Sequence, residues 1–204
     1  MNIKWIFFDV GSTLLDETEA YDHRAKEMIK GTDISFEEFD AVRRKFALQG
    51  YDGNSSAINY FGLTKTPWHS EDELPYPDSH STLNALKKKG YRLGIIANQN
   101  PGLRDRLALW GLEKYFDLII SSAEVGVAKP DRKIFDLALE AAECDAEKCL
   151  MVGDRLDNDV LPAKAVGMKT VWIKSGLAKL QSSSLAGEAA DFLINSLTEL
   201  TEIF

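Results

Sequence analysis

The sequence predicts an α/β fold, a doubly wound (Rossmann-like) parallel sheet that carries a small α-helical cap as an insertion. Short apolar runs typical of buried strands alternate with helical segments over most of the 204 residues. Such alternation favours a parallel sheet with helices on both faces. The stretch from residue 16 to residue 74 breaks the pattern, because it holds helical segments and no strand that the sheet needs. We therefore expect an α/β core formed by residues 1–15 and 75–204, and a helical cap formed by residues 16–74.

The core elements follow one another in a regular order. Three lysines and then Gly90 end the helix before the second strand, since cations stabilise the negative end of the helix dipole and glycine commonly follows it. Further core helices are expected around residues 103–110, 134–142 and 162–166, and the serine run at 182–184 indicates a loop. Six strands are expected, at Ile3–Phe8, Tyr91–Ala97, Leu118–Ser121, Cys149–Val152, Thr170–Ile173 and, on a shorter apolar run, Phe192–Ile194.

The expected cap consists of helices only. Its first two helices should span Glu19–Lys30 and Phe36–Gln49, and a third, weaker segment lies near Ser56–Phe61. Thr32, Asp33 and Ser35 are residues that favour a helix start, because their side chains can accept a hydrogen bond from the first turn. The charged faces of these segments are more typical of a solvated helix surface than of a binding patch.

Composition narrows the classes of partner. The 32 acidic and 24 basic residues give a net charge of −8, which argues against nucleic acid or an anionic membrane as the main partner. An anionic substrate stays possible, because one bound metal ion can reverse the local field. No apolar run is long enough to span a membrane and the N-terminus does not resemble a signal peptide, so a cytoplasmic location is expected. Nothing in the sequence indicates an oligomeric state.

Polar residues follow four of the predicted strands at the point where each strand ends. In a doubly wound sheet, ligands bind at the carboxyl ends of the strands, where the strand order reverses. Carboxylates from two strand ends, with one lysine, can meet there, and a hard cation such as Mg²⁺ prefers carboxylate oxygens. The residues at these ends are Asp9, Asn98, Lys129 and the pair Asp154 and Asp159.

Four segments in this order resemble the motifs of the haloacid dehalogenase-like (HAD) hydrolases: FFDVGSTLL, IIANQ, EVGVAKPDRKIF and MVGDRLDNDVLPAKAVGMKTVWI. The resemblance covers Ile3 to Ile173, and the inserted helices are placed as in family members with a helical cap after the first motif. It implies that Asp9 is the nucleophile that becomes an aspartyl phosphate. It also implies that Lys129 steadies Asp9 and the phosphoryl group.

The same resemblance implies a Mg²⁺ site. Asp154 and Asp9 would bind the ion together with the backbone carbonyl of Gly11, and Asp159 would support it from close by. Asp157 lies in the same loop, but its place in the motif is open. The substrate expected from the resemblance is a small phosphorylated molecule, and the residues expected to bind it are Ser12, Thr13, Asn98 and Lys129.

Two residues depart from the family pattern. Phosphatases of the family carry a second aspartate two residues after the nucleophile, where this chain has Gly11, which cannot transfer a proton. Ala97 stands where the second motif offers a hydroxyl to the phosphate, which leaves Asn98 or a backbone N–H as the substitute. The metal-binding pattern of the fourth motif argues against a dehalogenase. A phosphonatase would need a cap lysine, for which only Lys26 or Lys30 can be named.

Two hypotheses on function therefore remain. The first is a Mg²⁺-dependent phosphatase that acts on a small metabolite through an aspartyl phosphate. The alternative is a binding or regulatory protein of the HAD fold with little turnover, which Gly11 and Ala97 favour. Without a general acid, we expect a preference for substrates whose leaving group is weakly basic, such as acyl or aryl phosphates.

Overall fold

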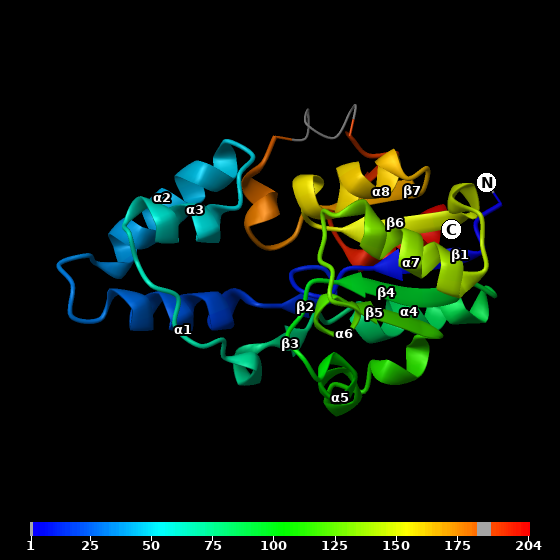
Figure 1. The fold of residues 1–204 in the computed structure, drawn as a ribbon, viewed down its shortest axis with the longest axis horizontal. Helices are drawn as coiled ribbons and strands as arrows, with labels where there is room; N and C mark the ends of the chain where they lie inside the picture. Colours follow the sequence, from blue (N-terminus) through cyan, green and yellow to red (C-terminus); the bar gives the residue numbers. More distant parts are fainter. Residues whose placement is uncertain (1, 183–188) are drawn as a thin grey trace.

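The computed structural model describes residues 2–182 and 189–204, so most of the serine run 182–184 lies outside the described residues. A six-stranded sheet forms the centre of the molecule, in the order β5-β4-β1-β6-β7-β8, and all neighbouring strands are parallel (Figure 1). This confirms the predicted fold class, including the shorter strand near the C-terminus. The strands are β1 Trp5–Phe8, β4 Arg92–Ala97, β5 Leu118–Ser121, β6 Cys149–Gly153, β7 Lys169–Ile173 and β8 Phe192–Ile194.

Helices cover both faces of the sheet, and each face has its own apolar core. In β1, Trp5 and Phe7 belong to one cluster, while Ile6 and Phe8 belong to the other, as expected for a strand buried on both sides. Helices α7 and α8 pack with the first cluster, and α4, α5 and α10 pack with the second. The core helices are α4 Ser79–Lys88, α5 Leu103–Leu109, α6 Ser122–Val125, α7 Arg132–Ala142, α8 Leu161–Ala165 and α10 Leu200–Ile203.

Three helices lie away from the sheet, within residues 16–74, the segment predicted to form a cap and called the cap below: α1 Thr18–Ile29, α2 Phe36–Leu48 and α3 Gly53–Tyr60 (Figure 1). They share a separate apolar cluster centred on Phe39. Of the three helix-start residues named from the sequence, Ser35 caps α2, where it forms a capping box with Glu38. The third helix begins three residues before the predicted Ser56, because the Asp52 carboxylate accepts a hydrogen bond from the Ser55 N–H and caps the helix there.

A two-stranded antiparallel ribbon, which the sequence did not reveal, connects cap and core. Its strands are β2 Leu15–Asp16 and β3 Leu74–Pro75. Leu15 pairs with Pro75 and Asp16 pairs with Leu74. Strands of two residues are too short to show an alternating pattern. The ribbon is anchored to the core because the Ser79 hydroxyl donates a 2.7 Å hydrogen bond to the Leu14 carbonyl.

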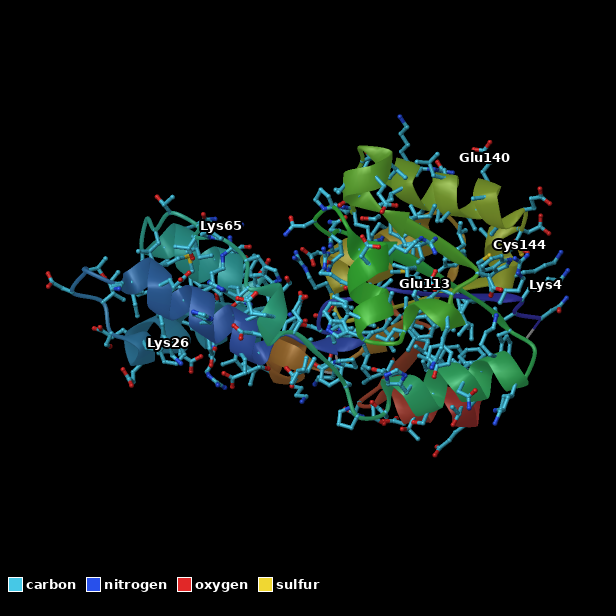
Figure 2. The ribbon with its side chains drawn as sticks, turned by 90° about the horizontal axis from the view of Figure 1, so that it is seen from below. Lys4, Lys26, Lys65, Glu113, Glu140 and Cys144 are labelled. Atoms are coloured by element: carbon cyan, nitrogen blue, oxygen red, sulfur yellow. The ribbon has the colours of Figure 1, made fainter. Side chains whose placement is uncertain are left out.

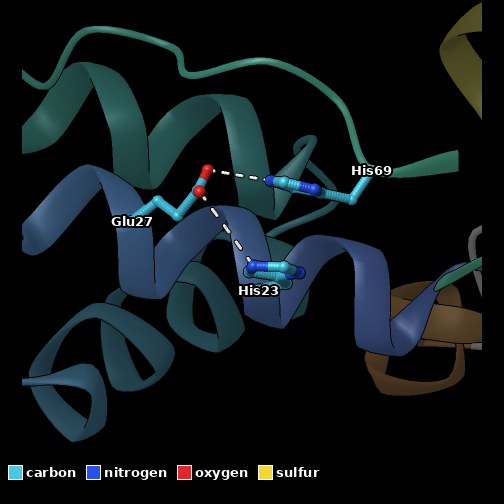
Figure 3. Close-up of side chains that lie close together, drawn as sticks. All are labelled: His23, Glu27 and His69. Atoms are coloured by element: carbon cyan, nitrogen blue, oxygen red, sulfur yellow. Dashed lines mark hydrogen bonds and ion pairs between the residues drawn. The ribbon is translucent and has the colours of Figure 1, made fainter. Parts of the chain in front are cut away.

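A cluster of ionisable side chains ties the segment that returns from the cap to helix α1 (Figure 3). His69 Nε2 and Glu27 Oε2 lie 2.9 Å apart, and His23 Nδ1 lies 2.8 Å from Asp72 Oδ2. The rings of His23 and His69 stack with their centroids 3.8 Å apart. These contacts join α1 to residues just ahead of β3, so they fix how the chain leaves the cap.

Side chains of the cap pack among themselves. Lys26 lies among the cap helices, away from the sheet (Figure 2). Its Nζ is 5.0 Å from the centroid of the Phe36 ring, so this lysine contacts another cap residue. Within residues 2–182 and 189–204, no helix combines the length and the apolar character needed to cross a bilayer.

Candidate active site

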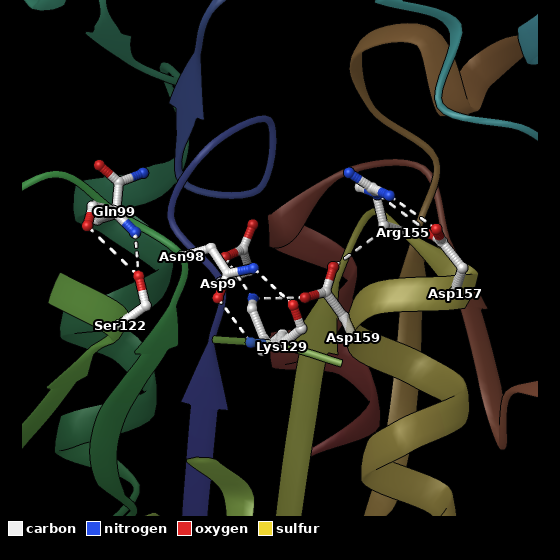
Figure 4. Close-up of polar contacts among 8 residues, drawn as sticks. All are labelled: Asp9, Asn98, Gln99, Ser122, Lys129, Arg155, Asp157 and Asp159. Atoms are coloured by element: carbon white, nitrogen blue, oxygen red, sulfur yellow. Dashed lines mark hydrogen bonds and ion pairs between the residues drawn. The ribbon is translucent and has the colours of Figure 1, made fainter. Parts of the chain in front are cut away.

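Asp9 lies directly beyond the carboxyl end of β1, at the centre of the sheet (Figure 4). Its backbone N–H donates a 2.9 Å hydrogen bond to the Val152 carbonyl, which continues the pairing of β1 with β6 by one residue. The chain proceeds from β1 to β4 and β5 on one side and then returns to β6 on the other side. Asp9 therefore stands at the point where the strand order reverses, the usual ligand site of such a sheet.

Lys129 links two of the predicted carboxylates. Its ammonium donates a 2.6 Å hydrogen bond to Asp9 Oδ1 and a 2.5 Å hydrogen bond to Asp159 Oδ1, and its side chain is fully buried. Burial alone would lower the pKa of Lys129, but the charges of Asp159 and Asp9 raise it above its usual value. Lys129 is thus held as a cation between the two acids.

The Asn98 side chain holds the backbone of Lys129 in place. The Lys129 N–H donates a 2.7 Å hydrogen bond to Asn98 Oδ1, and Asn98 Nδ2 donates a 2.8 Å hydrogen bond back to the Lys129 carbonyl (Figure 4). One hydrogen of the Asn98 amide remains for a ligand. Asn98 also lines a cavity next to the site, so its predicted contact with a phosphate is compatible with its position.

The three aspartates predicted to hold a metal lie together. Asp9, Asp154 and Asp159 each offer a carboxylate oxygen, and these oxygens lie within 4.8 Å of one another. Burial, and then the charges of Asp159 and Asp9, raise the pKa of Asp154 well above its usual value. Three carboxylates against one ammonium leave an excess of negative charge in a buried place. A hard divalent cation fits this set of donors.

Asp159 has both of its carboxylate oxygens in use. One accepts from Lys129, and the other accepts a 3.1 Å hydrogen bond from the Arg155 N–H. A Cβ added to Gly153 would lie 2.4 Å from the Asp159 Cβ, so only glycine lets Asp159 come this close to β6. These bonds suit Asp159 to the supporting role that the resemblance implies.

Asp157 lies outside the carboxylate cluster. Its side chain is 62% exposed and forms a 2.7 Å ion pair with Arg155 Nη2. The guanidinium of Arg155 also contacts Asp52 of the cap, with Nη1 and Oδ2 3.0 Å apart. Arg155, which sequence reasoning did not single out, therefore connects the loop after β6 to the cap.

The two hydroxyl residues after Asp9 are placed differently. Ser12 adopts a left-handed backbone conformation with φ 52°, and its carbonyl accepts a hydrogen bond from the Ser175 hydroxyl. Thr13 is fully buried, and its Oγ1 has no hydrogen-bond partner among the described residues. Gly11 lies between Asp9 and these residues, in the loop that forms an isolated bridge with Leu15. The predicted roles of these three residues toward phosphate and metal stay predictions.

A carboxyl group that the sequence did not reveal faces the site. Glu17 is 7% exposed, and its Oε2 accepts a 3.2 Å hydrogen bond from the Ser12 hydroxyl. Burial, with the charges of Asp9 and Glu73, raises the pKa of Glu17 to about 8. The loop after β1 folds back on itself, since the backbone N–H groups of Leu14 and Leu15 donate to the Val10 carbonyl, and this fold brings the chain near Glu17 back beside Gly11.

Glu17 borders a cavity of about 540 Å³ between cap and core. The cap contributes Tyr21, Arg24 and Lys65 to its wall, and the core contributes Asn98 and Gln99. A cavity of this size suits a small metabolite.

Comparison with known proteins agrees with this geometry. A family model described as "haloacid dehalogenase-like hydrolase" matches residues 3–167. The glyceraldehyde 3-phosphate phosphatase of Pyrococcus furiosus is 33% identical over 227 residues, which cover 98% of this chain and 92% of that protein. The pyrimidine 5'-nucleotidase YjjG of Escherichia coli is 40% identical over 131 residues, or 63% of this chain and 56% of that protein.

A solved structure extends the likeness to three dimensions. The HAD phosphatase from Thermococcus onnurineus superimposes with a TM-score of 0.67 at 29% identity, covering 98% of this chain and 97% of that one. The family match spans both sides of the cap and includes the first three segments and the fourth as far as residue 167, so it covers every carboxylate of the site and Lys129. The chain belongs to the haloacid dehalogenase-like hydrolases.

Proposed function

We propose that this protein is a Mg²⁺-dependent phosphatase that hydrolyses a small phosphorylated metabolite, with Asp9 as the nucleophile. The observation that carries the proposal is the buried Lys129 between Asp9 and Asp159, at the reversal point of the sheet. Relatives whose alignments cover nearly the whole chain are phosphatases. A cytoplasmic location and the absence of nucleic acid among the partners stay predictions.

Asp9 is placed to attack phosphorus. A carboxylate oxygen of Asp9 would form a bond to phosphorus while the ester oxygen departs, which divides one displacement into two easier steps. Lys129 orients Asp9 through its 2.6 Å hydrogen bond, and its charge offsets that of the incoming phosphate. Arg24 and Lys65 in the cavity wall supply further positive charge for an anionic substrate.

The carboxylate cluster fits a magnesium ion. Asp9 and Asp154, with the carbonyl of Gly11, would hold the ion, and Asp159 would support it. When bound, Mg²⁺ would neutralise charge on the phosphoryl oxygens and fix their orientation. The excess negative charge of the three carboxylates, and the high pKa of the buried Asp154, agree with a site built for a cation.

A panel of phosphate esters assayed with Mg²⁺, and again after chelation, tests the proposal. We expect turnover that requires the metal, together with a Mg²⁺-dependent beryllium-fluoride adduct on Asp9. Asp154→Asn should weaken Mg²⁺ binding at least about tenfold, equivalent to about 1.4 kcal/mol, in a calorimetric titration. Asp157→Asn is the matched control, because Asp157 is exposed and pairs with Arg155 instead.

The same experiment distinguishes this phosphatase from the alternative, a binding or regulatory protein of the HAD fold. A binding or regulatory protein would take up Mg²⁺ and form the adduct on Asp9, but it would turn over none of the esters in the panel. Mg²⁺ affinity that Asp154→Asn leaves unchanged would contradict the proposed metal site.

A further inference from the structure

Hydrolysis of a phosphate ester requires a group that moves protons. An alkoxide leaving group departs slowly unless it receives a proton, and the water of the second step must lose one. Residue 11 lies close to the nucleophile but is glycine, so it has no side chain for this task. The proton must come from another group near Asp9, if the proposed function is right.

The Glu17 carboxyl group occupies the space next to Gly11. A Cβ built on Gly11 would lie 2.4 Å from Glu17 Oε1 and 2.6 Å from Oε2. The carboxyl of Glu17 therefore lies where a side chain at position 11 would begin, although it comes from six residues further along the chain.

Two elements hold Glu17 in this position. It follows β2, whose pairing with β3 fixes the backbone on one side, and it is the residue that precedes the first turn of helix α1 on the other. The Ser12 hydroxyl donates a hydrogen bond to its Oε2. The side chain is almost fully buried and borders the cavity between cap and core. Within the described part of the chain, Glu17 has no ion pair that would occupy its oxygens.

The other ionisable groups of the cavity wall are less suited to the task. Asp52 is bonded to Arg155 and to the N-terminus of helix α3. Arg24 and Lys65 are cations, which suit binding of a phosphate. Glu73 is buried nearby, but it accepts a 2.8 Å hydrogen bond from Trp68 and does not border the cavity.

We propose that Glu17 is the catalytic acid and base of this protein, a carboxyl delivered by the cap junction into the space left free by Gly11. In the first step an Asp9 oxygen bonds to phosphorus, the bond from phosphorus to the ester oxygen breaks, and that oxygen takes the proton of Glu17. In the second step a water oxygen bonds to phosphorus, and Glu17 takes the water's proton. The bond from phosphorus to Asp9 then breaks, which releases phosphate and restores both residues.

Leaving-group dependence tests this role in Glu17→Gln, which keeps the size of the side chain and removes the acid. With glycerol phosphate we expect kcat/KM to fall by about 10²–10⁴-fold. With 4-nitrophenyl phosphate the first step needs little protonation, while the second still lacks its base. Rapid mixing should therefore show a burst of nitrophenolate equal to the enzyme concentration, followed by slow turnover.

Glu73→Gln is the matched control, because it replaces a neighbouring buried glutamate and can keep the hydrogen bond from Trp68. Because this variant keeps Glu17, it should hydrolyse glycerol phosphate far faster than Glu17→Gln and should show no burst with 4-nitrophenyl phosphate.

A carboxylate moved to position 11 gives a second test. Glu17→Ala combined with Gly11→Asp should turn over glycerol phosphate at least about tenfold faster than Glu17→Ala alone. Gly11→Asp alone should not do so, because its Cβ would collide with Glu17.

Two results would overturn the inference while leaving the proposed function intact. One is a Glu17→Gln variant that hydrolyses glycerol phosphate at the wild-type rate. The other is an equal loss on both substrates without a burst, which would indicate a purely structural role. A wild-type protein without Mg²⁺-dependent turnover would instead contradict the proposed function itself.

Discussion

Part of the Asp9 side chain is accessible, with 14% exposed, while the side chains of its neighbours Lys129 and Asp159 are buried. This arrangement leaves Asp9 open to a substrate and keeps it oriented. We expect Asp9→Asn to lower kcat/KM by at least about 10³-fold, since an amide is a poor nucleophile. Asp157→Asn, exposed and bonded to Arg155, should retain at least half of the activity. An Asp9→Asn protein as active as that control would refute the nucleophile assignment.

Gly153 allows Asp159 to approach the end of β6. In Gly153→Ala the new Cβ would meet the buried Asp159 side chain at 2.4 Å. Overpacking of this kind typically costs about 1–3 kcal/mol of unfolding free energy. Because the collision would displace Asp159, we also expect Mg²⁺ affinity to fall. Chemical denaturation and calorimetric titration measure the two effects.

Gly126→Ala provides the comparison for Gly153→Ala. Gly126 has φ 71° and open space around it, so this variant tests backbone strain without a collision. It should be less stable than wild type but should bind Mg²⁺ as tightly. If both variants bind Mg²⁺ equally well, the close packing at Gly153 has no bearing on the metal site.

The sequence predicted which residues meet at the site, because motif residues at the ends of parallel strands converge on one edge of a sheet. Asp9, Lys129, Asp154 and Asp159 are indeed brought together. The position of Glu17 could not be predicted in this way. Its place beside Gly11 follows from the way the loop of residues 9–15 folds back on itself, and that loop conformation has no recognisable sequence pattern.

Helices and strands were predicted correctly wherever their hydrophobic patterns extended over enough residues. The core strands carry continuous apolar runs because they are buried on both faces, so most of their ends were predicted within one residue, and β1 begins two residues later than expected. The third cap helix was less clear, because Gly53 and Asn54 are weak helix formers. Its start depends on the Asp52 cap, which is visible only in three dimensions.

The contact between His69 and helix α1 should make stability depend on pH. The hydrogen bond with Glu27, and then that with Glu71, raise the pKa of His69 above its usual value. Because the pKa of His69 is higher in the folded than in the unfolded protein, protonated His69 stabilises the fold. This stabilisation is fully present below the pKa of histidine in the unfolded chain, about 6.5. The stabilisation is lost as the pH rises through the pKa that His69 has in the folded protein. The hydrogen bond with His69 also lowers the pKa of Glu27, so this partner stays ionised in mildly acidic solution.

His69→Gln should therefore lower Tm more at pH 5.5 than at pH 8.5, measured by thermal unfolding in matched buffers. His80→Gln is the control, because His80 contacts the Tyr115 hydroxyl and not a carboxylate. Its effect on Tm should be the same at both pH values. An equal loss of Tm for His69→Gln at both pH values would show that the contact with Glu27 is not an ion pair.

The molecule has one apolar cluster in the predicted cap and others on the two faces of the sheet, and the two parts meet at several places, among them Gly53 beside Leu177. The core has apolar clusters on both faces of the sheet, and the cap has its own cluster around Phe39. The cavity lies between them, and residues of both line it. The Arg155–Asp52 ion pair crosses the same junction. The cavity wall and the proposed chemistry therefore draw on residues of both units, and Glu17 lies at the junction between them.

This organisation predicts that the core folds without the cap. Leu74 is paired with Asp16 at the end of the ribbon, so their backbones are close enough for a two-residue turn. Replacing residues 17–73 by Asn-Gly would close the ribbon as a hairpin, since this pair favours the type I′ turn. We expect cooperative unfolding, and Mg²⁺ affinity within about tenfold of wild type, because no carboxylate of the metal cluster is removed.

Hydrolysis should respond differently from metal binding in this capless protein. It lacks Glu17 and the cap side of the cavity wall, so turnover of glycerol phosphate should be lost. 4-Nitrophenyl phosphate should still transfer its phosphoryl group to Asp9 and give a burst of nitrophenolate. The full-length Glu17→Gln protein is the control, because it lacks the acid but keeps the cap; its KM for glycerol phosphate therefore reports what the cap contributes to binding. Circular dichroism, calorimetric titration with Mg²⁺ and rapid mixing provide the three measurements. A capless chain without a cooperative unfolding transition would show that the core depends on the cap for its fold, and the division into two independently packed units would then be wrong.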